Sequence, residues 1–407
     1  MTTDGPRQGA DHNVMREVNR SLVLAMIKQG GPVSRASVAR STGLAKPTVS
    51  AIVDELIGES LVSELGPGAT ASGGGRPPIL LQFNAASQLV VGLHIGARRT
   101  SVLLADATGA ELVRDEAPTP DGPAADALGD IAARVRDLLA DVAGARLSAV
   151  GAVLPGLTDF HTGVCLLAPN LGWRDVPVGA LLAAHLGAPV YVHNAGQAAA
   201  VAENLEGAGR QVGNLALLYA GTGLSAGVLS EGRVFHGVGG MAGEIGHCAV
   251  PGADEPCNCG KVGCLETVAS GPAIVRAVRR ALDAGESSAL SRSVDFDSRE
   301  VSAAAAAGDR VARAAIEQVG RNLGLAASWL INAYNPAVVV IGGGLAEIGD
   351  LLLVPLRQSV AEHALAPALR GVELRVSELG AAAEVRGAVL LALQHSETYY
   401  RVVFRSG

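Results

Sequence analysis

The sequence predicts an α/β protein in two parts, a small N-terminal winged helix-turn-helix and a larger two-lobed, actin-like domain. Three observations predict this division. Residues 16–57 show short amphipathic helices separated by glycine turns. From Leu89 onward, apolar strands alternate with helices, and the pattern occurs twice. A total of 407 residues is long for one domain and suggests two or three.

The composition is that of a compact globular protein, with 49% hydrophobic and 17% charged residues. No apolar stretch reaches the roughly 18 residues that a membrane helix needs. Residues Met1 to Ala10 are polar and lack the apolar core of a signal peptide, so a cytoplasmic protein without membrane contact is expected. Five cysteines, three of them closely spaced, fit a reducing compartment.

The first predicted helix covers residues 16–29, with apolar positions at Val18, Leu22, Ala25 and Met26. Ser34 caps a second helix over Arg35 to Ser41, and a turn at residues 42–44 places a glycine where the chain reverses. A third helix begins at Lys46-Pro47, with proline in the tolerated first turn, and continues to Ile57. Strands at residues 61–65 and 79–83 complete a β-wing around the turn-rich Gly66-Pro67-Gly68.

Local charge favours a DNA-binding role for this module, although the net charge of −7 argues against general nucleic-acid affinity. Residues 14–46 carry six basic side chains against one acid, Glu17. We expect the third helix to enter the major groove of double-stranded operator DNA. The alternative is a three-helix bundle that contacts proteins. The candidate DNA-binding residues are Arg35, Lys46, Pro47, Thr48 and Ser50.

Arg76 stands in a glycine–proline frame between the two wing strands. An arm of this composition can place a guanidinium in a narrow minor groove. A plain linker explains the same residues equally well, and the sequence leaves both interpretations open.

The larger part shows two lobes. In the first, strands at residues 89–96 and 100–105 form a hairpin closed at Gly109, followed by a helix over residues 124–144. In the second, a meander over residues 214–235 contains Gly221-Thr222-Gly223. A long helix over residues 309–334 then leads to a strand, Gly342-Gly343-Gly344 and a predicted helix N-terminus, an order that can hold phosphate. Two lobes of the same plan predict a duplicated fold around a cleft.

A histidine and three cysteines near the middle of the chain form a candidate metal site: His247, Cys257, Cys259 and Cys264. One imidazole and three thiolates complete the tetrahedral shell that Zn²⁺ takes in closed structural sites. Gly260 and Gly263 allow the chain to turn tightly enough to bring the sulfurs to one ion. The alternative is a set of unrelated thiols or a disulfide. Glu244 and Glu266 lie beside the ligands, as expected next to a binding site for a polar molecule.

From about Val14 to its C-terminal helix, the chain closely resembles the ROK family, which contains sugar kinases and sugar-responsive repressors. The resemblance depends on residues 239–247, 257–266, 335–344 and 170–173. The N-terminal module with Gly75-Arg76-Pro77 looks like the repressor branch. The implied domains are residues 1–83 and 84–407, with lobe 1 at about 84–193 plus 381–407 and lobe 2 at about 194–380. A homodimer or homotetramer is also implied.

The resemblance implies sugar contacts at five positions: Asn194, Glu244, His247, Glu266 and, through its backbone, Gly156. His247 would then face both the metal and the sugar. For Glu244 and Glu266 the alternative is exposed loop acids.

Two departures from the kinase pattern oppose phosphoryl transfer. Ala195 replaces the aspartate that serves kinases as general base, and a methyl group accepts no proton. The kinase phosphate loop, Asp-x-Gly-Gly-Thr, is replaced by residues 94–99, His-Ile-Gly-Ala-Arg-Arg. In the family that aspartate also contacts the hexose hydroxymethyl group. Its loss removes about 1.5–3 kcal/mol of binding from a hexose but nothing from a pentose such as xylose.

The expected function is a DNA-binding transcriptional regulator of carbohydrate genes, a repressor, controlled by a pentose or a modified sugar in a zinc-braced domain without kinase activity. The first alternative is an ATP-dependent sugar kinase with a fused DNA-binding domain. The second is a regulator that has lost sugar sensing and responds to a protein partner.

Overall fold

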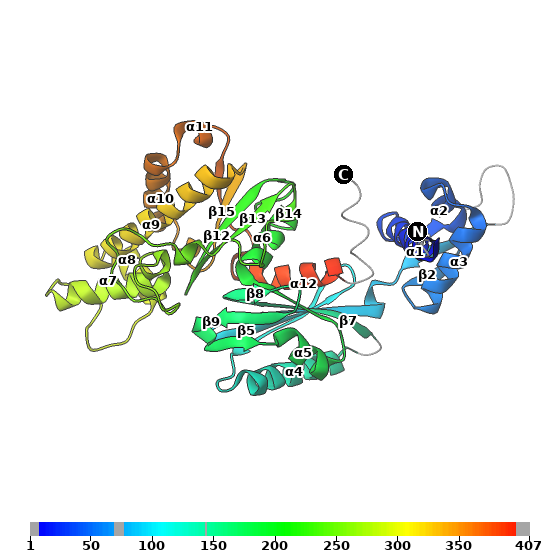
Figure 1. Ribbon diagram of the computed structural model, residues 1–407, viewed down its shortest axis with the longest axis horizontal. Coiled ribbons are helices and arrows are strands. Elements are labelled where there is room, and N and C mark those ends of the chain that lie inside the picture. The colour runs from blue at the N-terminus through cyan, green and yellow to red at the C-terminus, as the bar shows by residue number, and fades with distance from the viewer. Residues whose placement is uncertain (1–7, 69–76, 143–144, 396–407) are drawn as a thin grey trace, which may run out of the picture.

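The structure is a computed structural model that describes residues 8–68, 77–142 and 145–395. Figure 1 shows a small N-terminal head at one end of the molecule and two lobes beyond it. Arg76 lies outside the described residues, as do residues 396–407 of the predicted C-terminal helix. Among the described residues, no helix is long and apolar enough to cross a membrane.

The head has the element order that the sequence predicts. Ser34 accepts a hydrogen bond from the Ser37 amide and so caps the second helix, and Gly43, with φ of 70°, ends it in the left-handed region. Pro47 stands in the first turn of the third helix, which buries Val49, Ile52, Val53 and Leu56. The elements are α1 (Gln8–Gln29), β1 (Val33–Ser34), α2 (Arg35–Thr42), α3 (Lys46–Gly58), β2 (Val62–Pro67) and β3 (Ile79–Phe83).

Three details of the head differ from the sequence prediction. Leu22 is 40% exposed, whereas Val23 and Ile27 are buried, so the inner face of α1 is rotated from the predicted stripe. Gly66 and Pro67 belong to strand β2, where a bulge absorbs the positive φ of Gly66, instead of forming a turn. The short strand β1, which the sequence analysis missed, pairs with β3 and makes a sheet of order β1-β3-β2.

The predicted duplication is confirmed by the topology of two five-stranded sheets, ordered β11-β7-β4-β5-β6 and β14-β13-β12-β15-β16. In each sheet, three consecutive strands form an antiparallel meander, and two later strands add in parallel beyond the first strand of the meander. The strands of lobe 1 are β4 (Gln88–Ile95), β5 (Arg99–Asp106), β6 (Glu111–Pro118), β7 (Arg146–Leu154) and β11 (Val190–Asn194). Those of lobe 2 are β12 (Leu215–Ala220), β13 (Leu224–Ser230), β14 (Arg233–Val234), β15 (Val338–Gly342) and β16 (Glu373–Val376).

Helices cover both faces of each sheet because residues alternate between faces along a strand. In lobe 1, Val91 and Leu93 pack toward α4 (Ala124–Ala140) and α5 (Val178–Leu186), whereas Val90 packs toward α12 (Ala383–His395). In lobe 2, one face packs on α6 (Ala195–Leu205). The other packs on a helical layer of α7 (Gly271–Asp283), α8 (Ser298–Ala306), α9 (Arg310–Tyr334), α10 (Asp350–His363) and the nearby α11 (Ala366–Leu369).

Helices α6 and α12 occupy equivalent places in the two repeats and pack against each other between the sheets (Figure 1). Helix α6 follows β11, the last strand of the lobe 1 sheet, and α12 follows β16, the last strand of the lobe 2 sheet. The contact is close: a Cβ added at Gly387 on α12 would lie 2.0 Å from the Ala198 carbonyl oxygen on α6. Such a glycine contact leaves no room for a side chain. The two lobes therefore meet through a tightly packed helix pair.

Lobe 1 has strands that the sequence analysis missed. Gly109 closes the turn between β5 and β6, so the predicted hairpin is part of a three-stranded meander. A small sheet of β8 (Leu157–Asp159), β9 (Val164–Ala168) and β10 (Trp173–Val176) follows β7. Its strands are three to five residues long and are bounded by turns, which leaves little periodicity to detect in the sequence.

Candidate sugar and metal site

The four predicted metal ligands lie together. The ligand atoms of His247, Cys257, Cys259 and Cys264 are all within 4.8 Å of one another. The Cys257 sulfur is 3.6 Å from Nδ1 of His247, and the Cys259 and Cys264 sulfurs are also 3.6 Å apart. Tetrahedral zinc bonds of about 2.3 Å to sulfur and about 2.0 Å to nitrogen require separations of about 3.6–3.8 Å. The donor atoms and their spacing therefore fit a closed metal site.

Short turns place the ligands. Gly260 and Gly263 both have positive φ, 90° and 75°, as the predicted tight turns require. The Cys257 amide donates to the Lys261 carbonyl, and an isolated bridge joins Ala249 to Cys264. The loop therefore folds back on itself and brings all three sulfurs to one side of His247.

The five predicted sugar-contacting residues also converge. Nδ2 of Asn194 donates to the Gly156 carbonyl at 2.9 Å and to Oε1 of Glu244 at 3.0 Å. The other carboxylate oxygen of Glu244 lies 3.9 Å from Nε2 of His247. His247 thus directs Nδ1 to the cysteines and Nε2 to the polar residues, the division that the resemblance implies. Gly156 has φ of 115°, and a Cβ there would lie 2.4 Å from the Leu167 carbonyl, so only glycine fits.

Two carboxylates share this region. Burial, and secondarily the charge of Glu266, raises the pKa of Glu244 to about 7. Glu266 accepts the Leu224 amide at 2.9 Å at the Gly221-Thr222-Gly223 turn, which the β12–β13 hairpin presents to it. Two neighbouring acids in a half-buried place are an acceptor-rich arrangement, and the hydroxyl donors of a sugar would complement it.

The sequence analysis missed two contacts that hold this arrangement. Gln197 is 2% exposed and lies one turn of α6 after Asn194, which accepts its backbone amide. Its side-chain amide donates to the carbonyls of Gly240 and Ala242 at 3.0 Å and so fixes the loop that leads to Glu244. In addition, Asn258 of the cysteine loop donates to Asn170 of lobe 1 at 2.8 Å. Gln197 could have been found from the sequence, because it lies three residues after Asn194 and therefore one helical turn away on the same face.

The loop at the end of β4 has different chemistry. His94 lies with Nδ1 3.2 Å from a carboxylate oxygen of Glu384, the second residue of α12. Burial, followed by the charge and hydrogen bond of Glu384, raises the pKa of Tyr219 well above its usual value. Tyr219 therefore stays protonated and can donate to Glu384. The carboxylate of Glu384 at this loop is thus in contact with His94 and Tyr219.

The second glycine turn also differs from the predicted phosphate-binding form. After β15 the chain makes a 3₁₀ turn at Ala346–Ile348, and α10 begins only at Asp350. Glu347 and Asp350 are acidic residues at the starts of these two elements. A helix N-terminus favours anions, but neighbouring carboxylates repel phosphate.

The candidate DNA-binding residues occupy the start of α3. Lys46, Pro47 and Thr48 are exposed, and Ser50 is half-buried. Arg35 instead contacts other parts of the head, with Asp54 at 2.7 Å and Glu64 at 3.0 Å.

The basic face is smaller than predicted. Arg16 and Arg20 pair with Glu55 and Glu59, acids that lie outside residues 14–46 and so were not counted. Lys28 points toward the first lobe.

Comparison with known proteins places these features in a class. Two lobes of one topology joined to a small N-terminal head, with a His–Cys₃ cluster beside converging polar side chains, define a two-lobed sugar-kinase-like protein with an added module. Residues 90–395 match the ROK family, and the chain belongs to this family.

Relatives include both branches of the family. The xylose repressor of Caldicellulosiruptor bescii is 31% identical over 396 residues, covering 94% of this chain and 97% of the relative. The glucokinase of Halalkalibacterium halodurans is 39% identical but covers 62% of this chain and 78% of its own length. A solved ROK family transcriptional regulator, a homologue of the Escherichia coli MLC protein, has a TM-score of 0.79 at 30% identity, covering 95% and 98% of the two chains. The similarity to regulators therefore includes the head, whereas the glucokinase matches a smaller part of the chain.

Proposed function

We propose that this protein is a DNA-binding transcriptional repressor of carbohydrate genes, controlled by a sugar that binds next to a structural zinc ion. The observation that carries the proposal is the combination of a head and a sensor in one chain. A xylose repressor aligns with 94% of the chain, and the predicted sugar residues converge beside the His–Cys₃ cluster.

The head would bind operator DNA through the start of α3. Lys46, Pro47 and Thr48 are exposed there, at the N-terminal end of the helix that enters the major groove in proteins of this architecture. A homodimer or homotetramer would present two heads to a palindromic site. We assign Arg35 to holding α3 against the wing, because its three hydrogen bonds stay inside the head. Arg76, which lies outside the described residues, remains our candidate for a minor-groove contact.

The zinc ion would be held by His247, Cys257, Cys259 and Cys264 in a closed shell. When bound, it supplies structural bracing and leaves no open position for catalysis. Its role would be to fix the loops that carry Glu244 and Glu266, and His247 would link the two sites through its second ring nitrogen.

The effector would be a pentose such as xylose, or a sugar modified at the hydroxymethyl end. Ala195 offers no polar atom, and its methyl group packs in an apolar cluster with Val153 and Ala198. A hexose hydroxymethyl group would find no carboxylate at this position, whereas a pentose has no such group. The xylose repressors among the relatives agree with this choice.

The decisive experiment measures binding of the protein to its own upstream DNA with and without xylose, glucose and N-acetylglucosamine. We expect specific binding that xylose weakens by about 5–150-fold, the usual range for coupled sites. Lys46→Gln should weaken DNA binding and reduce the salt slope by about 1, with calorimetric xylose affinity unchanged. Absence of specific DNA binding would overturn the proposal, and tight glucose binding without xylose binding would overturn the effector assignment.

Sugar phosphorylation is the second candidate, because a glucokinase is among the relatives. We propose that this activity is absent, since His94 contacts Glu384 and Ala195 cannot accept a proton. An assay with ATP, Mg²⁺ and the same sugars decides the question. Turnover above that of a sample lacking protein would revive the kinase assignment.

A further inference from the structure

The turn between β5 and β6, residues Asp106–Ala110, contacts the head on one side and the helix pair between the lobes on the other. A carboxylate oxygen of Asp106 accepts hydrogen bonds from the Thr108 amide at 2.7 Å and the Ala110 amide at 3.1 Å. Gly109 adopts φ of 87°, which glycine tolerates best. The turn is therefore closed by its own hydrogen bonds, and its Ala107 and Gly109 carbonyls accept from side chains elsewhere.

On the head side, Lys28 at the end of α1 donates to the Ala107 carbonyl at 2.7 Å. The same ammonium lies 5.1 Å from the ring centroid of Phe83 at the end of β3. The Ala107 amide donates to the Ala85 carbonyl at 3.2 Å, in the segment that joins the head to lobe 1. The turn thus contacts the first helix of the head and the connecting segment, and Lys28, which it holds, also lies over the last strand of the head.

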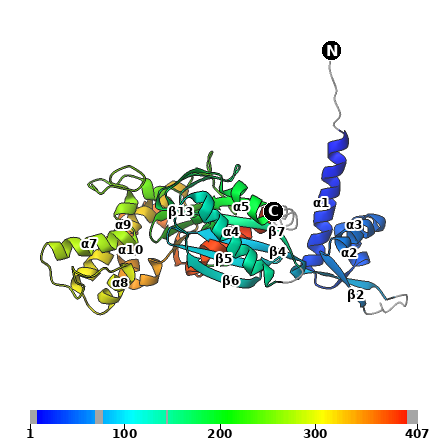
Figure 2. The ribbon, with the colours of Figure 1, turned by 90° about the horizontal axis from the view of Figure 1, so that it is seen from below.

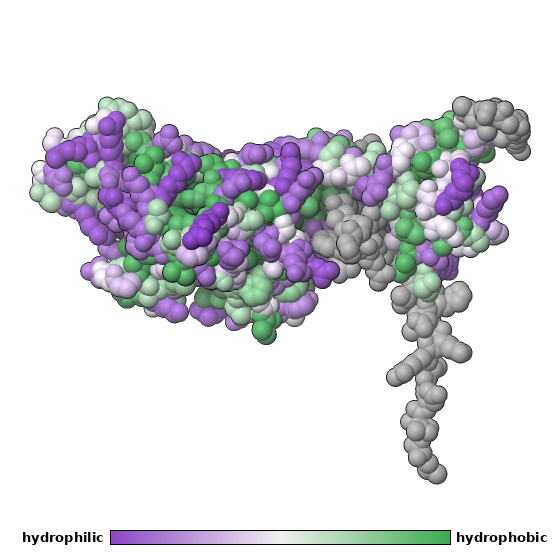
Figure 3. All heavy atoms as spheres, turned by 90° about the horizontal axis from the view of Figure 1, so that it is seen from above, coloured by the Kyte–Doolittle hydropathy of each residue, from purple (hydrophilic) through white to green (hydrophobic). Residues whose placement is uncertain are grey.

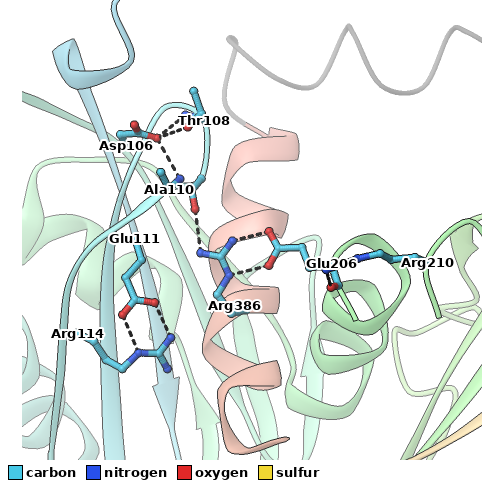
Figure 4. A network of polar contacts seen from close by, with 9 residues as sticks. Asp106, Thr108, Ala110, Glu111, Arg114, Glu206, Arg210 and Arg386 are labelled. Atoms are coloured by element: carbon cyan, nitrogen blue, oxygen red, sulfur yellow. Dashed lines mark hydrogen bonds and ion pairs between the residues drawn. The ribbon is translucent and has the colours of Figure 1, made fainter. Parts of the chain in front are cut away.

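On the other side, Arg386 of α12 donates through Nη1 to the Gly109 carbonyl at 2.8 Å (Figure 4). Its Nε donates to Glu206 at 2.8 Å, and its Nη2 donates to the second oxygen of the same carboxylate. The paired geometry is the two-point contact that arginine makes with a carboxylate. Arg386 belongs to the helix packed on the sheet of lobe 1, and Glu206 directly follows the helix packed on lobe 2. This ion pair therefore crosses between the lobes.

Helix α6 connects Glu206 to the predicted sugar site. Its N-cap is Asn194, which contacts Glu244, and its C-cap is Glu206. Its 11 residues, at about 1.5 Å each, give a rigid rod of about 16 Å. The glycine contact between Gly387 and Ala198 lies along this rod, so α6 and α12 touch backbone to backbone. A shift of Asn194 would therefore be transmitted along α6 to Glu206, the residue that Arg386 holds.

We propose that Lys28, the Asp106–Ala110 turn and the Arg386–Glu206 ion pair form the connection that carries movement between the lobes to the DNA-binding head. The inference rests on the proposed function, because it assigns a route for the sugar response of that same site. Sugar binding shifts the N-terminus of α6, the cross-lobe ion pair follows, and Arg386 changes its hold on the turn that anchors Lys28. The ligand must favour one arrangement of this connection for the head to respond.

The first test compares operator affinity with and without xylose in three full-length variants. Arg386→Gln removes the ion pair, and Lys28→Met removes the ammonium while keeping the apolar stem. Arg114→Gln is the matched control, because Arg114 pairs with Glu111 on β6 (Figure 4), and among the described residues no hydrogen bond or ion pair joins it to Lys28 or Arg386. We expect the first two variants to reduce the effect of xylose on operator affinity to about twofold or less. The control should keep the wild-type ratio of operator affinities without and with xylose. The double variant Lys28→Met/Arg386→Gln should reduce the effect of xylose on operator affinity no further than either single change, because both changes break the same route.

The second test needs neither sugar nor DNA. Hydrogen exchange should accelerate at the Ala107 amide and in the last turn of α1 in Arg386→Gln, but not in Arg114→Gln. If Arg386→Gln fails to fold, Lys28→Met is measured instead and should accelerate exchange at Ala107. Unchanged exchange at Ala107, or a wild-type xylose effect in folded Arg386→Gln, overturns the connection. If the wild-type protein binds no DNA or ignores every sugar, the proposed function fails, and the exchange measurement still decides whether the turn links head and lobes.

Discussion

The predicted sugar-site residues and the loop at the end of β4 use polar side chains in different ways. At the first, Glu244 lies beside Asn194 and Glu266, and burial, followed by the charge of Glu266, raises the pKa of Glu244 to about 7. At the second, Glu384 contacts His94 at 3.2 Å and accepts a hydrogen bond from Tyr219. Two carboxylates lie close together in one place, whereas a single carboxylate is shared by a histidine and a tyrosine in the other.

The difference teaches where the molecule gathers hydrogen-bond acceptors. Crowded carboxylates gain from a ligand that brings hydroxyl donors, whereas an acid already matched by His94 and Tyr219 gains little from a metal–phosphate group. Two places on one duplicated scaffold have thus been specialised separately. The surface in Figure 3 shows hydrophilic and hydrophobic residues interspersed over the visible face of the body.

The largest expected effect comes from Cys264→Ser, which would remove a buried ligand of the His–Cys₃ cluster. A structural zinc ion contributes about 10–16 kcal/mol of apparent binding free energy, so loss of a thiolate should release the metal and loosen the loops that carry Glu244 and Glu266. We expect zinc content to fall from one ion per chain toward none, and xylose binding to be lost. Elemental analysis and calorimetry measure these changes.

The matched control is Cys248→Ser, because Cys248 is an exposed cysteine next to His247 that does not belong to the cluster. It should keep both zinc and sugar binding. Equal zinc content in Cys264→Ser and the wild-type protein would contradict the assigned shell.

Glu244→Gln should have the next largest effect. At a pH above the Glu244 pKa of about 7, the change replaces a charged acceptor by a neutral amide, and hydrogen bonds to charged groups contribute about 1.5–3 kcal/mol, or about 10–150-fold in affinity. We expect calorimetric xylose affinity to fall by that factor with zinc content unchanged. Glu286→Gln, at an exposed acid after α7, is the control and should bind xylose as the wild-type protein does. Wild-type affinity in Glu244→Gln would show that this acid does not face the sugar.

Glu384→Gln should have the smallest effect and should be confined to stability. The change weakens the contacts to His94 and Tyr219, which should lower the unfolding free energy by about 1–2 kcal/mol. A lower urea midpoint together with unchanged xylose affinity would sharpen the contrast between the two places. A large loss of xylose affinity would break it.

Local features of this chain were predictable from sequence because their partners are close in sequence. The cap at Ser34, the turn at Gly43 and the metal-ligand spacing from Cys257 to Cys264 each lie within one short segment. The short strands of the small sheet were missed because they carry too few residues for a periodic signal. The stripe on α1 was only partly right: Ala25 is buried and Met26 packs on the core of the head, but Leu22 is exposed and Val23 and Ile27 are buried in its place.

The sequence by itself determined the duplicated α/β plan, the N-terminal head, the four candidate metal ligands and the substitution of Ala195, since each depends on residue type and short spacing. Only the tertiary structure decided which charges neutralise one another. Glu55 and Glu59 form ion pairs with two arginines of the head, and Arg386 forms one with Glu206, 180 residues away in the sequence. In the same way, Gln197 holds the loop before Glu244 through contacts that are distant in sequence. The physical reason is that long-range pairing depends on how the sheets and helices pack, and no local pattern records that packing.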